Sequence, residues 1–129
     1  MDFLVSVTLL DVPAFVYVDS AQTTSVTAAA DTYYVVDTAS AAVTIKFPTA
    51  VAIGHWIVVQ NAPAGGKQLG GTSAGHNVTL VAGAGETFEG ASSVALSPPT
   101  GSTTAACRQY FPVGSQAAQS GFGPGWAHV

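Results

Sequence analysis

Residues 33–61, YYVVDTASAAVTIKFPTAVAIGHWIVVQN, contain the densest series of strand and turn signals in the chain. The stretch opens with an aromatic and β-branched run, Tyr33–Asp37, which is typical of a strand. Ala42–Phe47 then alternates apolar and polar residues, the period of a half-buried strand, and Pro48 ends it because proline has no amide hydrogen to donate to a sheet. His55–Gln60 supplies another strand after a glycine. The stretch therefore predicts closely spaced strands joined by short turns.

The same signals recur along the rest of the chain, and no segment has a sustained 3.6-residue period. Further strands are expected at Phe3–Leu10, Ala14–Val18, Thr23–Thr27, Asn77–Val81, Val94–Leu96 and Thr103–Phe111. Residues 65–75 and 114–125, rich in glycine and small polar residues, are expected to be loops. We predict an all-β protein of about nine or ten short strands in a compact sandwich or prism-like domain.

The order of these motifs resembles a module of tailed-bacteriophage virion proteins. It is carried by VVDTASAAVTIKFPTAVAIGHWIVVQNA at 35–62, by HNVTLVAGAGETFEGASSVALS at 76–97, and by a late Gly-Trp. Phe47-Pro48 stands where the family has Leu-Pro, Glu86–Gly90 where it has a glycine turn, and Gly125-Trp126 where it has its terminal tryptophan motif. The resemblance runs from Tyr33 to Val129. It implies a capsid decoration, head-fibre, tail-fibre or spike type of β domain, assembled as a homotrimer.

The composition points to an oligomer independently of that resemblance. Of 129 residues, 48% are hydrophobic and only 8% are charged, against about 25% charged in ordinary soluble domains. Much of the surface must then be covered by other chains. The alternative is a monomer with a neutral surface rich in threonine, serine and alanine.

Charge and terminal sequence exclude several partners. The net charge is −4, and Lys46, Lys67 and Arg108 are too far apart in sequence to form a phosphate-binding cluster, so no nucleic-acid partner is expected. The first residues carry Asp2 in place of a basic leader region, and no apolar run reaches the ~18 residues that cross a membrane. We expect no membrane association, synthesis in the host cytoplasm, and a place on the capsid exterior. A single cysteine, Cys107, fits a reducing compartment and is expected to be buried.

The sequence contains only weak signals for catalytic or metal-binding residues. Ser73 lies in a Gly-x-Ser-x-Gly motif, but that nucleophile motif needs a strand before it and a helix after it, and a glycine loop precedes it here. Glu86 and Glu89 lie three residues apart around a turn, which suits solvated acids better than a glycosidase pair. The three histidines lack metal-ligand spacing. We expect no enzyme activity, no cofactor and no metal, although in a trimer one histidine could meet its copies on the three-fold axis.

Two groups of aromatic and apolar residues are candidate binding sites. The segment 1–30 precedes the resemblance proper and is expected to form N-terminal strands or an attachment arm, whereas 31–129 forms the β domain. The candidate attachment residues are Phe3, Val5, Val7, Phe15 and Tyr17. The alternative is that this segment pairs within its own subunit. Phe122 and Trp126 are candidates for exposed, sugar-stacking aromatics, with packing in the core as the favoured alternative.

These inferences together predict a virion structural protein. The favoured role is a capsid decoration or cement protein that binds the major capsid protein and stabilises the shell. The alternative is a short tail-fibre, spike or head-fibre tip that binds host surface glycans.

Overall fold

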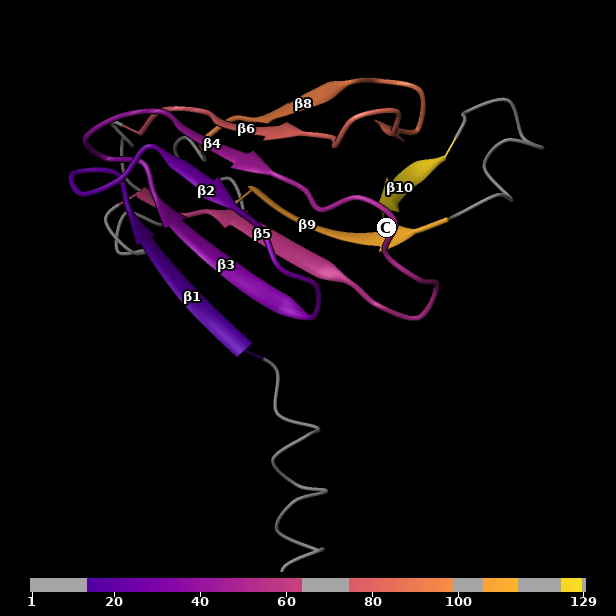
Figure 1. The fold of residues 1–129 in the computed structure, drawn as a ribbon. Helices are drawn as coiled ribbons and strands as arrows, with labels where there is room; N and C mark the ends of the chain where they lie inside the picture. Colours follow the sequence, from indigo (N-terminus) through magenta and orange to yellow (C-terminus); the bar gives the residue numbers. More distant parts are fainter. Residues whose placement is uncertain (1–13, 64–74, 99–105, 114–123, 129) are drawn as a thin grey trace, which may run out of the picture.

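The computed structural model describes residues 14–63, 75–98, 106–113 and 124–128 of the chain. These residues form ten strands in two sheets that lie face to face, with no α-helix (Figure 1). The all-β prediction is confirmed. The strands are β1 (Ala14–Asp19), β2 (Ser25–Thr27), β3 (Thr32–Asp37), β4 (Val43–Lys46), β5 (Ile57–Asn61), β6 (Val78–Val81), β7 (Thr87–Phe88), β8 (Ser93–Leu96), β9 (Ala106–Pro112) and β10 (Gly125–His128).

The chain alternates between the two sheets as it advances. The larger sheet has the strand order β1-β3-β5-β9-β10-β7 and the smaller sheet has the order β2-β4-β6-β8. Strands β1, β3 and β5 are parallel to one another, and so are β2, β4 and β6. Ala14 pairs with Thr32, and Ser25 pairs with Thr44. The first six strands therefore make three turns of a flattened β-coil, in which each turn adds one strand to each sheet.

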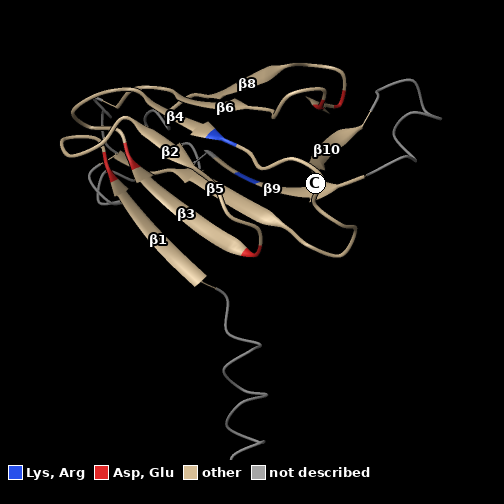
Figure 2. Cartoon of the chain, viewed as in Figure 1, with Lys and Arg blue, Asp and Glu red and all other residues tan. Residues whose placement is uncertain are grey.

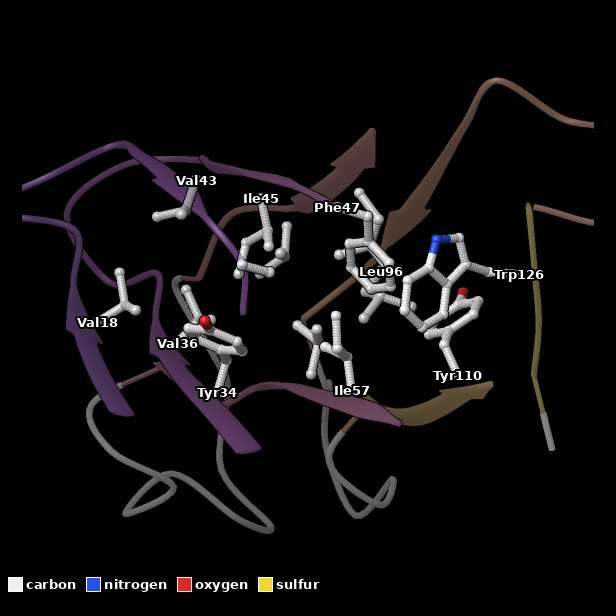
Figure 3. Packing of buried hydrophobic residues seen from close by; sticks show 14 of the residues in the cluster. Val18, Tyr34, Val36, Val43, Ile45, Phe47, Ile57, Leu96, Tyr110 and Trp126 are labelled. Carbon is white, nitrogen blue, oxygen red and sulfur yellow. The ribbon is translucent and has the colours of Figure 1, made fainter. Parts of the chain in front are cut away.

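The core lies between the two sheets because each strand points alternate side chains inward. β3 shows this pattern most clearly, with Tyr34 and Val36 buried and the intervening residues half-exposed. β4 does the same with Val43 and Ile45. Figure 3 shows these side chains meeting between the sheets. The buried cluster comprises Val18, Ala28, Tyr34, Val36, Val43, Ile45, Phe47, Ile57, Val59, Val78, Leu80, Phe88, Leu96, Tyr110 and Trp126.

An aromatic cluster closes one end of this core. Phe47, just past the end of β4, packs edge-on against Phe88, Tyr110 and Trp126, with ring centroids 4.9, 5.5 and 5.0 Å away. These three rings come from β7, β9 and β10, the strands that end the larger sheet. β9 runs antiparallel to β5, and β10 antiparallel to β9. The C-terminal strands thus finish the coil with antiparallel pairs and large rings.

The structure contains two short strands that the sequence did not predict. Thr87–Phe88 lies in the expected glycine turn but pairs with Gly125–Trp126 as a two-residue parallel ladder. β10 begins at the end of a segment expected to be a loop. Each of these strands is too short to show a period in sequence, and each is defined by its partner. The strand expected at Phe3–Leu10 lies outside the described residues.

Gly125 is required where β10 meets β7. Its φ is +146°, which disfavours residues with a side chain, and an added Cβ would overlap the backbone of Thr87. Gly125→Ala is expected to lower the free energy of unfolding by about 1–3 kcal/mol more than Gly54→Ala. Gly54 is the matched control, since its φ is +107° but nothing lies within 4 Å of an added Cβ. Chemical denaturation measures both losses, and equal losses would contradict the predicted overlap.

Candidate functional site

The candidate site is the outer face of the larger sheet, the face turned away from the core. Side chains that alternate with the buried ones point outward here, and the strand register aligns them in two rows. One row is Phe15, Tyr33, Val58 and Gln109; the next is Tyr17, Val35, Gln60 and Cys107. We call these eight residues the outer face. They come from β1, β3, β5 and β9, four neighbouring strands (Figure 1).

The outer face presents exposed aromatic rings at its β1 margin. Phe15 and Tyr17 are 67% and 58% exposed, high values for large aromatic side chains. Phe15 stacks on Tyr33 with ring centroids 5.0 Å apart and 26° between the ring planes. Val58, in the same row, is only 8% exposed although its side chain points away from the core. The face is therefore a partly self-packed apolar layer.

Hydrogen bonds orient the two tyrosine side chains of this face. The Tyr33 hydroxyl donates to Gln60 Oε1 at 2.9 Å and lies 3.6 Å from Cys107 Sγ. The Tyr17 hydroxyl donates to Asp37 Oδ2 at 2.9 Å. Both bonds cross from one strand to another. They fix the position of each phenol hydroxyl relative to the neighbouring strand.

The same contacts shift the ionisation of the phenols. Burial, followed by the hydrogen bond and charge of Cys107, raises the pKa of Tyr33 from 10.0 to about 12. The hydrogen bond to Asp37 is the main cause that raises the pKa of Tyr17, with smaller contributions from burial and from the charges of Asp37 and Asp19. Both phenols are neutral at physiological pH, so neither tyrosine adds charge to the outer face.

Charged residues border the outer face without entering it. Asp19 and Asp37 are register partners at the ends of β1 and β3. In Figure 2 these two strands are tan along their length, the colour of residues other than Lys, Arg, Asp and Glu, and are red only near their ends. Lys46 lies on the smaller sheet, and Arg108 alternates with Cys107 on β9 and so points to the opposite side. The eight residues of the outer face include no Asp, Glu, Lys or Arg.

The structure places the predicted attachment residues unevenly. Phe15 and Tyr17 lie exposed on β1, which pairs along its whole length with β3 of the same chain. The alternative prediction, pairing within the subunit, therefore describes Ala14–Asp19. On the other side of this strand Val18 is buried, whereas Val16 is 38% exposed. Phe3, Val5 and Val7 lie outside the described residues.

Trp126 is not an exposed binding aromatic. It is 1% exposed, and its ring packs edge-on against Phe47 in the closing cluster. The prediction of exposure came from the glycines around it, but β10 pairs with both β9 and β7 and carries the ring into the core. Phe122, the other candidate, lies outside the described residues. Cys107 was expected to be buried and is exposed, because it lies on the outward side of β9.

The candidate acidic and histidine side chains have separate hydrogen-bond partners in loops and at strand ends. Glu86 Oε2 accepts from the Ala50 amide at 2.8 Å, whereas Glu89 Oε1 lies 2.6 Å from His128 Nδ1. His55 Nδ1 lies 2.8 Å from Asp31 Oδ2, so each of these two histidines has a carboxylate partner of its own.

His76, the third histidine, binds the backbone. Its Nδ1 lies 2.8 Å from the carbonyl oxygen of Thr38. Within the described residues no group of three or more His, Cys, Asp or Glu side chains could hold a metal ion. Ser73 lies outside that part of the chain.

Sequence reasoning missed the central residues of the outer face. Tyr33 was recognised only as a strand position, and Gln60 was not singled out. Strand period alone places Tyr33 and Val35 on the same side of β3, but it does not show which strands lie beside β3. The rows across the sheet follow from the parallel register, for which the sequence offered no signal.

Comparison with known proteins does not place the chain in a family. No protein-family model matches it, and no curated protein matches it. In the part of the chain that the structure describes, no helix is long and apolar enough to cross a membrane. The outer face is thus the feature from which a function can be argued.

Alkaline titration tests the contacts of Tyr33. In the folded protein the phenolate of Tyr33 is expected to form near pH 12. Below pH 11, wild type and Tyr33→Phe should therefore show the same phenolate absorbance. Because the folded pKa is the higher one, the neutral phenol contributes stability that is complete below about pH 10 and is lost as pH rises through about 12. Wild type should therefore lose stability relative to Tyr33→Phe in this window. A Tyr33 phenolate that forms at pH 10 would contradict the described contacts.

Proposed function

We propose that this protein is a non-enzymatic structural component of a tailed-phage particle, a homotrimeric capsid decoration protein that binds the major capsid protein and stabilises the shell. The observation that carries the proposal is the outer face, an uncharged aromatic layer on a sheet with no cover from the described part of the same chain. Such a layer suits permanent contact with other protein chains. The resemblance of the sequence to virion modules supplies the setting.

The fold supports a structural role in a second way. Its strands are short and its turns are fixed by specific contacts, such as the bond from the Ala50 amide to Glu86 and the pairing of His128 with Glu89. These polar side chains are used to hold loops and strand ends in place.

A glycan-binding fibre or spike tip is the second candidate, and one observation favours it. The stacked pair Phe15 and Tyr33 lies beside Gln60, so that ring faces and hydrogen-bonding groups occur together. Aromatic faces with nearby polar groups are also the chemistry that binds sugars. Glycan-array binding that is lost in Phe15→Ala would favour this role over decoration.

The copy number on the particle decides between the two functions. In purified virions of the phage that carries this chain, quantitative mass spectrometry should find it in amounts comparable to the major capsid protein, and antibody labelling should cover the shell. Shells assembled without the protein should break at lower temperature, and adding it back should restore their resistance. A few copies confined to the tail would contradict the decoration role and support the fibre tip.

A further inference from the structure

We propose that the outer face is the surface through which copies of this chain bind one another, with Phe15 and Tyr17 inserting into the neighbouring subunit. The inference rests on the proposed homo-oligomeric function and identifies the surface responsible for it. It also assigns Phe15 and Tyr17 to contacts between copies, and leaves attachment to the shell to other surfaces.

The first argument is the parallel arrangement of β1, β3 and β5. Sheets built from parallel strands are normally covered on both faces, and their strands are then apolar on both sides. These three strands have that composition, with Tyr34 and Val36 pointing inward and Tyr33 and Val35 pointing outward. The smaller sheet covers only the inner side (Figure 1). The outer side therefore has the composition of a covered face, and no described segment of the chain covers it.

The absence of charged side chains on the outer face indicates which partner covers it. A nucleic acid or a charged lipid surface would require basic residues, and none lies on the outer face. Asp19 and Asp37 at its margin would repel such partners further. An uncharged apolar face meets a neighbouring copy without charge repulsion, also in a trimer, where the neighbour presents a different surface, whereas two charged faces of one sign repel each other. The low charge of the whole chain, 8% of residues, fits the same partner.

The size of the face suits the centre of an interface. The four strands have five to seven residues each. With strands about 4.8 Å apart and residues about 3.3 Å apart along each strand, their plane has an area of about 400 Å². That matches the largest apolar patches on folded chains, about 300–600 Å², which are often functional. Stable interfaces use about 800 Å² per partner, with an apolar centre and a polar rim. The outer face supplies the centre, and the strand ends with their acidic and glutamine side chains supply the rim.

Phe15 is the residue to change, because it is exposed and packs its ring on Tyr33. Phe15→Lys places a charge on the exposed β1 side of the contact. Ile53→Lys is the matched control, since Ile53 is 64% exposed and lies in the loop between β4 and β5, away from the outer face. Light scattering with sedimentation should show an oligomer for wild type and Ile53→Lys. Phe15→Lys should raise the dissociation constant about tenfold or more, with an unchanged far-ultraviolet spectrum.

Cys107 provides a second measurement on the same proteins. It is exposed in the single chain and lies in the row of Tyr17 and Val35, so self-association through this face would cover it. Its thiol should react slowly with a thiol reagent in wild type and Ile53→Lys. In Phe15→Lys it should react fast. A Phe15→Lys oligomer of wild-type mass, with an equally slow thiol, would overturn the proposal.

The remaining outcomes separate this proposal from the proposed function. A wild-type monomer at high concentration would overturn the proposal that copies associate through the outer face. Glycan binding by that monomer would indicate that the outer face binds a sugar instead. An oligomer disrupted by Phe15→Lys but absent from the shell of the particle would support the surface and refute the decoration role. An oligomer on the shell that resists Phe15→Lys would support decoration and refute this surface.

Discussion

The side-chain amide of Asn61 ties the two sheets together at the end of the core opposite the aromatic cluster. It is fully buried at the end of β5, and its Oδ1 accepts from the Thr38 hydroxyl at 2.7 Å. Its Nδ2 donates to the carbonyl oxygens of His76 and Leu96 at 2.9 and 2.8 Å. Leu96 belongs to β8 in the smaller sheet, and His76 leads into β6. One side chain thus satisfies backbone groups at the ends of several turns of the coil, where an unpaired buried group would cost about 1–3 kcal/mol.

A coil of this kind explains why one sheet face is left open. Each turn adds a strand to both sheets, so the apolar side chains between the sheets are buried by the advance of the chain itself. The two ends of the core are closed by different means, the rings around Phe47 at one end and the amide of Asn61 at the other. Among the described residues, the coil supplies no further strand on the outer side of β1, β3 and β5. The outer face is the surface through which we propose that copies of the chain associate.

Much of the fold could be predicted from sequence, and the reasons for the failures are physical. Val43 and Ile45 alternate within one strand, so β4 was found, and Pro48 marked its end. The pairing of β1 with β3 could not be found, because period two gives the faces of a strand and not its neighbours. Trp126 was a candidate for exposure because its glycines suggested a loop, but the favoured alternative of packing describes it, and one of those glycines permits β10 to approach β7. Residues in the candidate site were recognised as aromatic strand positions, but their assembly into rows needed the register.

The buried amide of Asn61 holds the coil closed, and its contribution to stability can be measured by comparing two asparagine-to-leucine variants. Equilibrium unfolding should be measured for Asn61→Leu and for Asn77→Leu, the same substitution at an exposed asparagine just before β6. Asn61→Leu leaves the Thr38 hydroxyl and the carbonyls of His76 and Leu96 without this partner, so we predict a loss of about 2–4 kcal/mol. Asn77→Leu should change stability by about 0.5 kcal/mol or less. Equal, small losses at the two positions would contradict the account.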